Sequence, residues 1–464
     1  MPFWTYDNLA TWSGGRWRPA PPALPLSGVT NDTRVIQAGN LFVALRGTRA
    51  DGHDFLGQAF AMGAGGALVA CDARLPDPLP GPVLVVDDPL AALGRIAAGY
   101  RLTLSGTVVT GVSGSVGKTT VKELLASMLA AAWPTARSRG NWNNDLGLPL
   151  SLLAVEPTDR AAVLEVGISH PGEMAPLAGL LRPDWALISN IGPVHIEFFQ
   201  NLEAIASEKA MLFEALTGRG AAVLDADGEL AGALARRAPG RVVTISRQRV
   251  TADYFGTLPP RPGAPAGVTE TASGECFKFR PPLPGDHHVT NTLLAIAAAR
   301  GQGLAWSQIE AGLADFVAPP MRWQQLDVGG VMVINDAYNA NPLSMAAALR
   351  TFADTPVAGQ RWLMLGDMLE LGVQAESSHA GIGRQAAAGP WAGLITLGPL
   401  AAQLAGAVRD AGARFPVLEC TTHAAAARAL AEHLHPGDAV LLKASRGMKL
   451  EEVLAAFKMV ISKQ

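Results

Sequence analysis

Short apolar runs alternate with longer amphipathic stretches along two parts of the chain. The first series consists of "AAVLEVG", "WALISNIG", "AAVLDAD" and "RVVTIS", between residues 161 and 246. The second consists of "VMVINDA", "RWLMLGD", "GLITLG" and "DAVLLKAS", between residues 331 and 445. Apolar runs of this length, separated by helical patterns, predict buried strands of mostly parallel sheets with helices on their faces.

Breaks in this alternation predict the domain organisation. The first part of the chain contains "GNLFVALRGTRADGHDFLGQAFAMGAGGALVACD", which predicts a strand, a loop, a helix and a strand. The composition then shifts at "SGTVVTGVSGSVGKTT". Residues 251–284 favour loops and short hairpins, and a pair of prolines near residue 318 marks a second boundary. We therefore expect an α/β fold with three domains, at residues 1–106, 107–318 and 319–464.

The composition narrows the class of protein. Hydrophobic residues make up 49% of the chain and charged residues 17%, which is typical of a folded globular protein. A formal net charge of −3 offers no basic stripe, so we expect no nucleic-acid partner. Although the mean hydropathy is +0.20, the uncharged run of 17 residues between Asp54 and Asp72 is rich in Ala and Gly and is short for a membrane-spanning helix. We therefore expect no membrane insertion.

The cysteines and the N-terminal segment indicate the compartment. Cys71, Cys276 and Cys420 are scattered, odd in number and without metal-binding spacing, which fits a reducing compartment. The segment "MPFWTYDNLATWSGG" has no basic stretch followed by an apolar one, so it does not resemble a secretory signal. We expect a cytoplasmic protein.

The stretch "TGVSGSVGKTTVKELL", residues 110–125, is typical of a phosphate-binding loop that opens a helix. Glycines allow backbone N–H groups to converge on phosphate oxygens, and the helix dipole favours the negative charge. The usual first glycine is replaced by Val112. We expect Lys118 to lie along the β- and γ-phosphates and the Thr119 hydroxyl to reach Mg²⁺. The residues predicted to surround the phosphates are Gly114, Ser115, Val116, Gly117, Lys118, Thr119 and Thr120.

Candidate metal ligands follow two predicted strands. Glu165 ends the run "AAVLEVG", where a carboxylate lies at the sheet edge at which α/β folds bind ligands. His195 lies in "SNIGPVHIE", just beyond the next strand. A lone histidine in a loop is often structural, but its position beside the phosphate-loop sheet favours contact with a metal.

Lys209 stands out in the segment "NLEAIASEKAMLFEAL". The apolar residues of this segment form one stripe at helical spacing, and Lys209 falls on that stripe. An inward-facing lysine costs desolvation unless it snorkels, pairs or loses its charge. Two interpretations stay open: a snorkelling lysine at the edge of the stripe, or a neutral amine that has captured CO₂ as a carbamate. A carbamate would add a metal-binding carboxylate.

Taken together, several segments resemble the Mur ligase family, the ATP-dependent amide-forming enzymes of peptidoglycan precursor synthesis. The resemblance covers nearly the whole chain and lies in "GSVGKTT", Glu165, "NIGPVHIE", Lys209, "GDHHVTN" and the terminal "KASRGMKLEEV". It implies that ATP is the nucleotide, with Asn291 on its adenine side, and that His288 stands where Asn is usual. It also implies Mg²⁺ held by Thr119, Glu165, His195 and Lys209 as a CO₂-derived carbamate.

Within the family, three stretches resemble the member that joins D-alanyl-D-alanine to UDP-N-acetylmuramoyl-tripeptide. They are "NWNNDLGLPLSLL", "NDAYNANPLSM" and "LGDMLELG". The N-terminal segment "NDTRVIQAGNLFVALRGTRADGHDF" resembles the family's UDP-binding domain, and the last domain its Rossmann-like one. The resemblance assigns Arg322 and Asp336 to ATP, and assigns to substrate Thr33, Arg34, Asn143, Asn144, Tyr338, Asn339 and Asn341.

Ordinary structural roles remain open for several of these residues. Asn143 and Asn144 could cap a helix, "YNANP" could be a turn before a helix, and Arg34 could be a plain loop arginine. Arg322 could brace the domain junction or reach the ATP phosphates. Asn335 replaces the first of two usual aspartates, which leaves Asp336 as the expected nucleotide contact.

The implied reaction begins with transfer of the ATP γ-phosphate to the terminal carboxylate of the tripeptide. The amine of D-alanyl-D-alanine would then attack this acyl phosphate, with Lys118, Glu165, His195 and Lys209 as the catalytic group. Two alternatives remain: a folylpolyglutamate-type or other Mur-type amide ligase, and a non-catalytic ATP-binding regulatory protein. We expect a monomer, as in many three-domain enzymes that close on their substrates.

Overall fold

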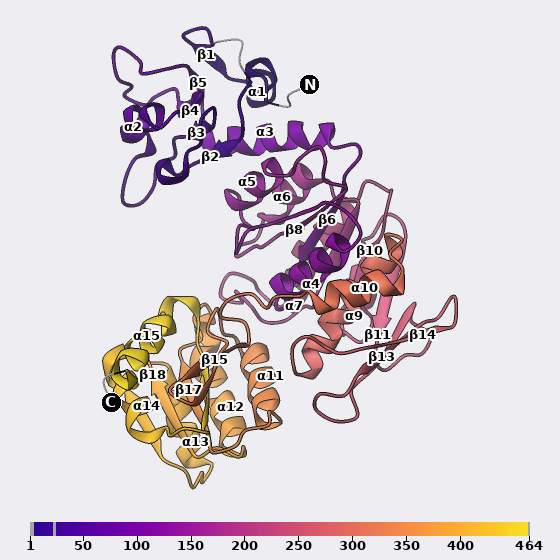
Figure 1. The fold of residues 1–464 in the computed structure, drawn as a ribbon, viewed down its shortest axis with the longest axis vertical. Coiled ribbons are helices and arrows are strands. Elements are labelled where there is room, and N and C mark those ends of the chain that lie inside the picture. Colours follow the sequence, from indigo (N-terminus) through magenta and orange to yellow (C-terminus); the bar gives the residue numbers. More distant parts are fainter. Residues whose placement is uncertain (1–3, 22–24, 463–464) are drawn as a thin grey trace.

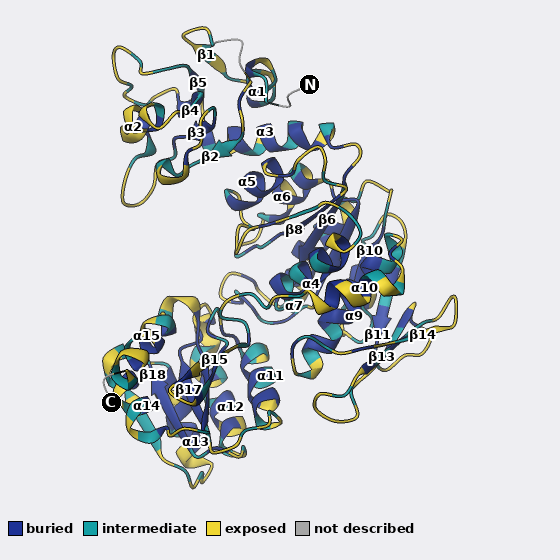
Figure 2. Ribbon diagram, viewed as in Figure 1, coloured by how far each residue is buried: buried dark blue, intermediate teal, exposed yellow. Residues whose placement is uncertain are grey.

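The computed structural model describes residues 4–21 and 25–462, and it contains three α/β units, each built on its own sheet (Figure 1). The three units follow one another along the sequence, and the strands at the centre of each sheet are buried (Figure 2). The expected three-domain α/β architecture is confirmed. Residues 1–3 of the N-terminal segment discussed above lie outside the described residues.

The N-terminal unit is a five-stranded sheet of order β1-β5-β4-β3-β2, in which only the β1–β5 pair is antiparallel. Its strands are short, and the central ones are apolar and fully buried. Its elements are β1 Arg16–Arg18, β2 Val29–Thr30, β3 Leu41–Val43, β4 Gly66–Ala70, β5 Val83–Val86, α1 Tyr6–Ser13 and α2 Leu56–Ala61.

The central unit is a nine-stranded sheet of order β14-β13-β12-β11-β10-β9-β6-β8-β7. Pairing is parallel from β7 to β12, and the last two strands form the hairpin expected after residue 251. The strands are β6 Val108–Ser113, β7 Thr135–Arg137, β8 Ala161–Glu165, β9 Trp185–Ile188, β10 Ala222–Asp225, β11 Val242–Ser246, β12 Tyr254–Thr257, β13 Ala266–Glu270 and β14 Glu275–Phe279.

Helices cover both faces of the central sheet. One buried cluster joins α4, α9 and α10 to the sheet, and another joins α5, α6 and α7 to it. The chain passes from β6 to β8 on one side and then returns to β9 on the other, so β6 lies at a topological switch point, where such folds bind ligands. The helices are α4 Lys118–Ala130, α5 Gly147–Leu153, α6 Met174–Leu181, α7 Leu202–Glu214, α8 Ala231–Ala235, α9 Asp286–Gly301 and α10 Trp306–Ala314.

Helix α3, Pro89–Thr103, joins the first two units (Figure 1). It packs against α1 on one side and against α5 and α6 on the other. Near its end the Tyr100 hydroxyl donates to the Val155 carbonyl at 2.6 Å, and Arg101 forms a buried ion pair with Asp184 at 3.0 Å. The helix is therefore anchored to the central unit before the boundary expected at residue 106.

The C-terminal unit is a six-stranded sheet of order β15-β16-β20-β17-β18-β19, parallel except for the β15–β16 pair. The elements of this unit are β15 Gln324–Val328, β16 Val331–Asn335, β17 Arg361–Gly366, β18 Gly393–Leu397, β19 Val417–Cys420, β20 Ala439–Lys443, α11 Pro342–Ala353, α12 Ala375–Ala387, α13 Ala401–Asp410, α14 His423–His433 and α15 Leu450–Ile461.

Within the described residues, no helix of the chain is long and apolar enough to cross a membrane.

Candidate active site

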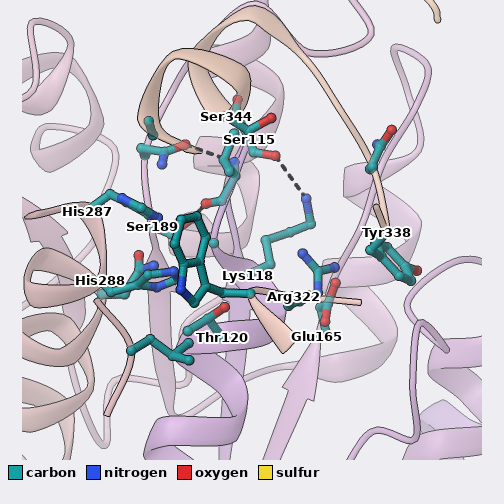
Figure 3. A pocket seen from close by; sticks show the side chains of 18 of the residues that line it. Ser115, Lys118, Thr120, Glu165, Ser189, His287, His288, Arg322, Tyr338 and Ser344 are labelled. Carbon is teal, nitrogen blue, oxygen red and sulfur yellow. Dashed lines mark hydrogen bonds between the residues drawn. The ribbon is translucent and has the colours of Figure 1, made fainter. Parts of the chain in front are cut away.

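A cleft of about 2800 Å³ runs between the central and C-terminal units and extends to α3. The phosphate loop, the end of β8 and the start of α9 line it from the central unit. Arg322, Asp336 and Tyr338 line it from the C-terminal unit. Figure 3 shows His287 and His288 on one side of Lys118, and Arg322, Glu165 and Tyr338 on the other.

Two glycines give the phosphate loop its shape. Gly114 has φ 137°, and a Cβ there would lie 2.0 Å from the Ser189 hydroxyl. Gly117 has φ 84°, and a Cβ there would lie 2.7 Å from the Asn291 side-chain oxygen. Both positions therefore require glycine for conformation and for space. The loop also brings Asn291, the expected adenine-side residue, against the start of α4.

Lys118 begins α4 and folds back over the loop. Its Nζ donates to the carbonyls of Gly114 at 2.9 Å and Ser115 at 3.2 Å. Burial lowers the pKa of Lys118, and the carboxylate of Glu165 opposes that shift. An anion placed between the loop N–H groups and this amine would meet a cation and a helix N-terminus together.

Glu165 is the buried carboxylate beside the loop, at the end of β8. The Thr119 hydroxyl donates to Oε2 at 2.7 Å, and the Asn143 amide donates to Oε1 at 2.8 Å. The Glu165 backbone N–H donates to the Ser138 hydroxyl at 2.9 Å. Both carboxylate oxygens are thus oriented by a neutral donor and keep further lone pairs for a cation.

These oxygen donors fit Mg²⁺ in type but not in number. A hydroxyl and a carboxylate are ligands that Mg²⁺ prefers, usually together with waters and substrate phosphates. Among the described residues, no three His, Cys, Asp or Glu side chains gather as a complete metal cage. A cation here would therefore need oxygens from a nucleotide, from water or from a modified side chain.

Lys209 on α7 is buried, with 3% of its surface exposed. Its Nζ makes no hydrogen bond or ion pair with any of the described residues. The neighbouring Glu208 instead accepts the backbone N–H groups of Gly172 and Met174. Burial, and to a smaller extent the charge of Lys118, lower the pKa of Lys209 well below its ordinary value. The side chain is an inward-facing amine that resists protonation, not a snorkelling lysine.

His195 lies in the loop after β9 and lines the same cleft as Lys118 and Glu165. Its φ is 56°, an unusual value for a residue with a side chain. Burial lowers the pKa of His195, and the charges of Lys118 and Lys209 add to this, whereas Glu370 opposes it. The ring is therefore held in its neutral form, which is the form that binds metals.

Two histidines form the opposite side of the cleft. The rings of His287 and His288 lie 4.0 Å apart, and His288 is buried. Burial lowers the pKa of His287 to about 4 and lowers that of His288 well below its ordinary value. The Nδ1 atom of His288 is buried without a hydrogen-bond partner in the described part of the chain.

Arg322 connects the two units across the phosphate loop. Its guanidinium lies 4.1 Å from the centre of the Tyr338 ring and donates to the Thr119 hydroxyl at 2.9 Å. Asp336, at the end of β16, forms an ion pair with Lys443 at 2.6 Å. The structure thus brings Arg322, Tyr338 and Asp336 to the cleft; the predicted contacts of Arg322 and Asp336 with ATP and of Tyr338 with substrate stay predictions.

Four predicted substrate residues have local structural roles. Asn144 accepts the Gly147 N–H at 2.9 Å at the start of α5, and Asn341 caps α11 through the Ser344 N–H at 2.9 Å. The Asn339 side chain accepts the N–H of the next residue. Asn143 holds Glu165, so it acts on the candidate metal carboxylate. Of the two residues for which capping stayed open, Asn144 has a cap-type bond and Asn143 does not; the turn before a helix describes Asn341.

Thr33 and Arg34 lie apart from the phosphate loop. They belong to the short 3₁₀ helix Thr33–Val35 of the N-terminal unit and are not among the residues that line the cleft. The exposed Arg34 side chain pairs with Asp32 at 2.6 Å, and this contact lowers the pKa of Asp32 to about 2. Their predicted contact with a nucleotide stays a prediction.

Sequence reasoning missed three residues that shape the site. Lys122 is fully buried and donates to the Ser138 carbonyl at 2.8 Å, so it supports the residue that holds the Glu165 backbone. Glu370 contacts His195 from the C-terminal unit. For Lys122 the available signal was its position one turn after Lys118, and for Glu370 it was the segment "LGDMLELG". The contacts of Ser138 and Glu370 join segments that are distant in sequence.

The chain matches three family models in order. Residues 25–101 match the Mur ligase family, catalytic domain; residues 112–299 the Mur ligase middle domain; and residues 321–446 the Mur ligase, glutamate ligase domain. A curated relative, the UDP-N-acetylmuramoyl-tripeptide–D-alanyl-D-alanine ligase of Bacillus subtilis, is 36% identical over 431 residues, which cover 92% of each chain.

Solved structures give the same result. MurF from Acinetobacter baumannii superposes with a TM-score of 0.86 at 28% identity, over 98% of this chain and 99% of that one. MurF ligase from Thermotoga maritima in complex with ADP gives 0.80 at 26% identity, over 94% and 98%. The fold and the site thus define an ATP-dependent ligase, and the chain belongs to the Mur ligase family. The expected use of ATP is confirmed at the level of the family.

Proposed function

We propose that this ligase joins D-alanyl-D-alanine to the terminal carboxylate of UDP-N-acetylmuramoyl-tripeptide, in peptidoglycan precursor synthesis. The observation that carries the proposal is the cleft itself, where Lys118, Glu165 and Arg322 from two units converge beside the phosphate loop. Relatives named for this reaction match over nearly the full length of the chain, which supports this choice over other amide ligases.

The chain's own cations would act on ATP. Loop N–H groups and Lys118 would hold the β- and γ-phosphates, and Arg322 would reach the γ-phosphate from the other unit. Transfer of the γ-phosphoryl group to the tripeptide carboxylate forms an acyl phosphate and releases ADP. The dipeptide amine then attacks the carbonyl carbon and phosphate leaves, while Lys118 stabilises the developing negative charge.

Mg²⁺ fits this site. Thr119 and Glu165 would hold one ion, and Glu165, His195 and a carbamate on Lys209 a second. When bound, Mg²⁺ supplies positive charge to the phosphate and carboxylate oxygens. Asn143 holds the Glu165 carboxylate and Ser138 holds its backbone N–H, so both bonds are made without the nucleotide.

Carbamylation suits Lys209 because the amine is buried and unpartnered among the described residues. A neutral amine nitrogen bonds to the carbon of CO₂ and loses a proton, which leaves an anionic carbamate. The new charge would lie within the field of Lys118, which already acts on Lys209. It would add the carboxylate that the described residues lack.

Substrate contacts complete the proposal. Thr33 and Arg34 would hold the uridine diphosphate end in the N-terminal unit, at a distance from the phosphate loop. Asp336, Tyr338 and the loop before α11 would cover the nucleotide as the C-terminal unit closes, which would keep water from the acyl phosphate. We further propose a cytoplasmic monomer.

The test is phosphate release by the purified protein with ATP and Mg²⁺, with the UDP-linked tripeptide and the dipeptide added singly and together. We expect release only with both, and a product heavier by one dipeptide less one water. Release that does not depend on the dipeptide would refute the proposal. Turnover without either peptide would instead indicate an ATP-binding regulator, and turnover with a folate and glutamate would indicate the folylpolyglutamate-type alternative.

A further inference from the structure

The segment "LGDMLELG", singled out in the sequence, has no part in the reaction described above. It leaves β17 and carries Glu370 to the central unit, where Oε2 lies 2.6 Å from Nδ1 of His195. His195 is mostly buried, whereas about half of the Glu370 side chain, 49%, is exposed. This carboxylate–imidazole contact is therefore a second link between the two units, besides the bond from Arg322 to Thr119.

Both residues of this contact have strained backbones. His195 has φ 56° and Glu370 has φ 62°, in the left-handed region, which a residue with a side chain seldom adopts. Gly372, at φ 52°, lies so close to the His195 loop that a Cβ would come within 3.2 Å of Glu197. Such strain persists only where the surrounding structure holds it, and it gathers at functional sites.

The Glu370 carboxylate lies beside one ring nitrogen of His195 and leaves the other without a neighbouring partner. Nδ1 is buried, and Oε2 of Glu370 lies 2.6 Å from it, a close contact that is not a hydrogen bond in the described structure. Nε2 makes no hydrogen bond with any described residue. Metal-binding histidines generally give their other ring nitrogen to a carboxylate or carbonyl, which fixes the tautomer and the ring orientation.

We propose that Glu370 is a positioning residue for His195: the C-terminal unit supplies the carboxylate that orients the ring, so that Nε2 faces the metal. The proposal rests on the proposed function, in which His195 holds a Mg²⁺ ion. Metal affinity then depends on the position of the unit that closes over the nucleotide. An open enzyme would hold this ion weakly, and a closed one would hold it tightly.

The proposal is tested by binding of Mn²⁺ to the full-length protein with ADP, followed by the electron paramagnetic resonance signal of free Mn²⁺. The variants are Glu370→Ala, Glu370→Gln, His195→Ala and the double variant Glu370→Ala/His195→Ala. Glu376→Gln is the matched control, because Glu376 is an exposed acid of the same unit without an ion pair among the described residues. This measurement needs neither peptide substrate, so it reports on the ion even if the proposed ligation fails.

We expect Glu370→Ala to weaken the binding of one Mn²⁺ about 10- to 100-fold, and Glu370→Gln to weaken it less, because the amide oxygen can still lie beside Nδ1. The control should bind as the wild type does. The double variant should bind no more weakly than His195→Ala, because Glu370 acts through that ring. Unchanged Mn²⁺ binding in Glu370→Ala, or additive losses in the double variant, would overturn the proposal.

A second readout separates positioning from general damage. If the enzyme ligates, Glu370→Ala should raise the Mg²⁺ concentration needed for half-maximal activity, while kcat at saturating Mg²⁺ stays within a few-fold of the wild type. A loss of kcat that excess Mg²⁺ does not restore would contradict a role in metal binding.

Discussion

The two walls of the cleft are built in different ways. The central wall is made of bonds within one unit: Glu165 is held by Thr119, Asn143 and Ser138 whatever the other units do. The C-terminal wall contacts the candidate catalytic and metal-binding residues through single side chains: Arg322 contacts Thr119, and Glu370 contacts His195. The phosphate and metal site is therefore preformed on one side and depends on domain position on the other.

Within the preformed wall, removal of the Lys118 amine should lower activity most. Lys118→Ala should lower kcat about 10²- to 10³-fold, because it removes a charge placed where negative charge develops in the transition state. Steady-state kinetics with both peptide substrates measure this loss. A decrease confined to KM for ATP would mean that Lys118 only holds the nucleotide.

Arg322 tests the wall that depends on closure. Arg322→Lys keeps the charge but loses the planar group that stacks on Tyr338 and reaches Thr119. We expect an activity loss of about tenfold, smaller than that of Lys118→Ala and expressed in both KM for ATP and kcat. A loss equal to that of Lys118→Ala would show that the two walls contribute alike.

Two neighbouring asparagines of the central wall, Asn143 and Asn144, separate a contact with the candidate metal-binding carboxylate from a purely structural contact. Asn143→Ala should raise the Mg²⁺ requirement and lower activity about tenfold, because Glu165 loses a donor. Asn144→Ala should cost about 1 kcal/mol of unfolding free energy through loss of the α5 cap, with activity unchanged. Urea unfolding and Mg²⁺ titrations of activity measure both. Equal effects on activity would show that Asn144 also contacts substrate.

The Lys209→Met variant tests a small effect on the stability of the folded protein. Unlike Asn144→Ala, it should stabilise the fold and not destabilise it. Because burial lowers the pKa of Lys209, the unfolded chain holds a proton that the folded chain releases, up to a pH of about 10.4. Its contribution to stability therefore rises with pH over that window. Lys209→Met should raise Tm at pH 7 by a few degrees in CO₂-free buffer and flatten the pH dependence, while activity is lost.

Thermal unfolding from pH 6 to pH 9 provides the test, with the exposed Lys449→Met as control. A lower Tm for Lys209→Met at pH 7 would mean that the amine is paired or charged in the folded state. Full activity of Lys209→Met would refute the carbamate. The carbamate would also be refuted if added bicarbonate did not change the activity of a variant whose activity is weakened.

The sequence allowed the local parts of the site to be predicted well. The glycine pattern identified the phosphate loop because a positive φ and a close backbone approach leave little choice of residue, as Gly114 and Gly117 show. Helical spacing identified Lys209 as an inward residue because burial on a helix follows its periodicity. For Asn144 and Asn341 the sequence left two roles open, because the same side chain can cap a helix or bind a substrate; the structure shows the local bonds, and the substrate contacts stay predictions.

What the amino-acid sequence determined by itself is therefore what short-range geometry controls: the strands, the loop, the helix that carries Lys209 and the order of three α/β units. Only the tertiary structure decided which polar groups meet. Ser138 reaches Glu165 from 27 positions away, Arg322 reaches Thr119 from 203 positions away, and Glu370 approaches His195 across the cleft. Such pairs depend on how separate units pack together, and no periodicity within one segment encodes that packing.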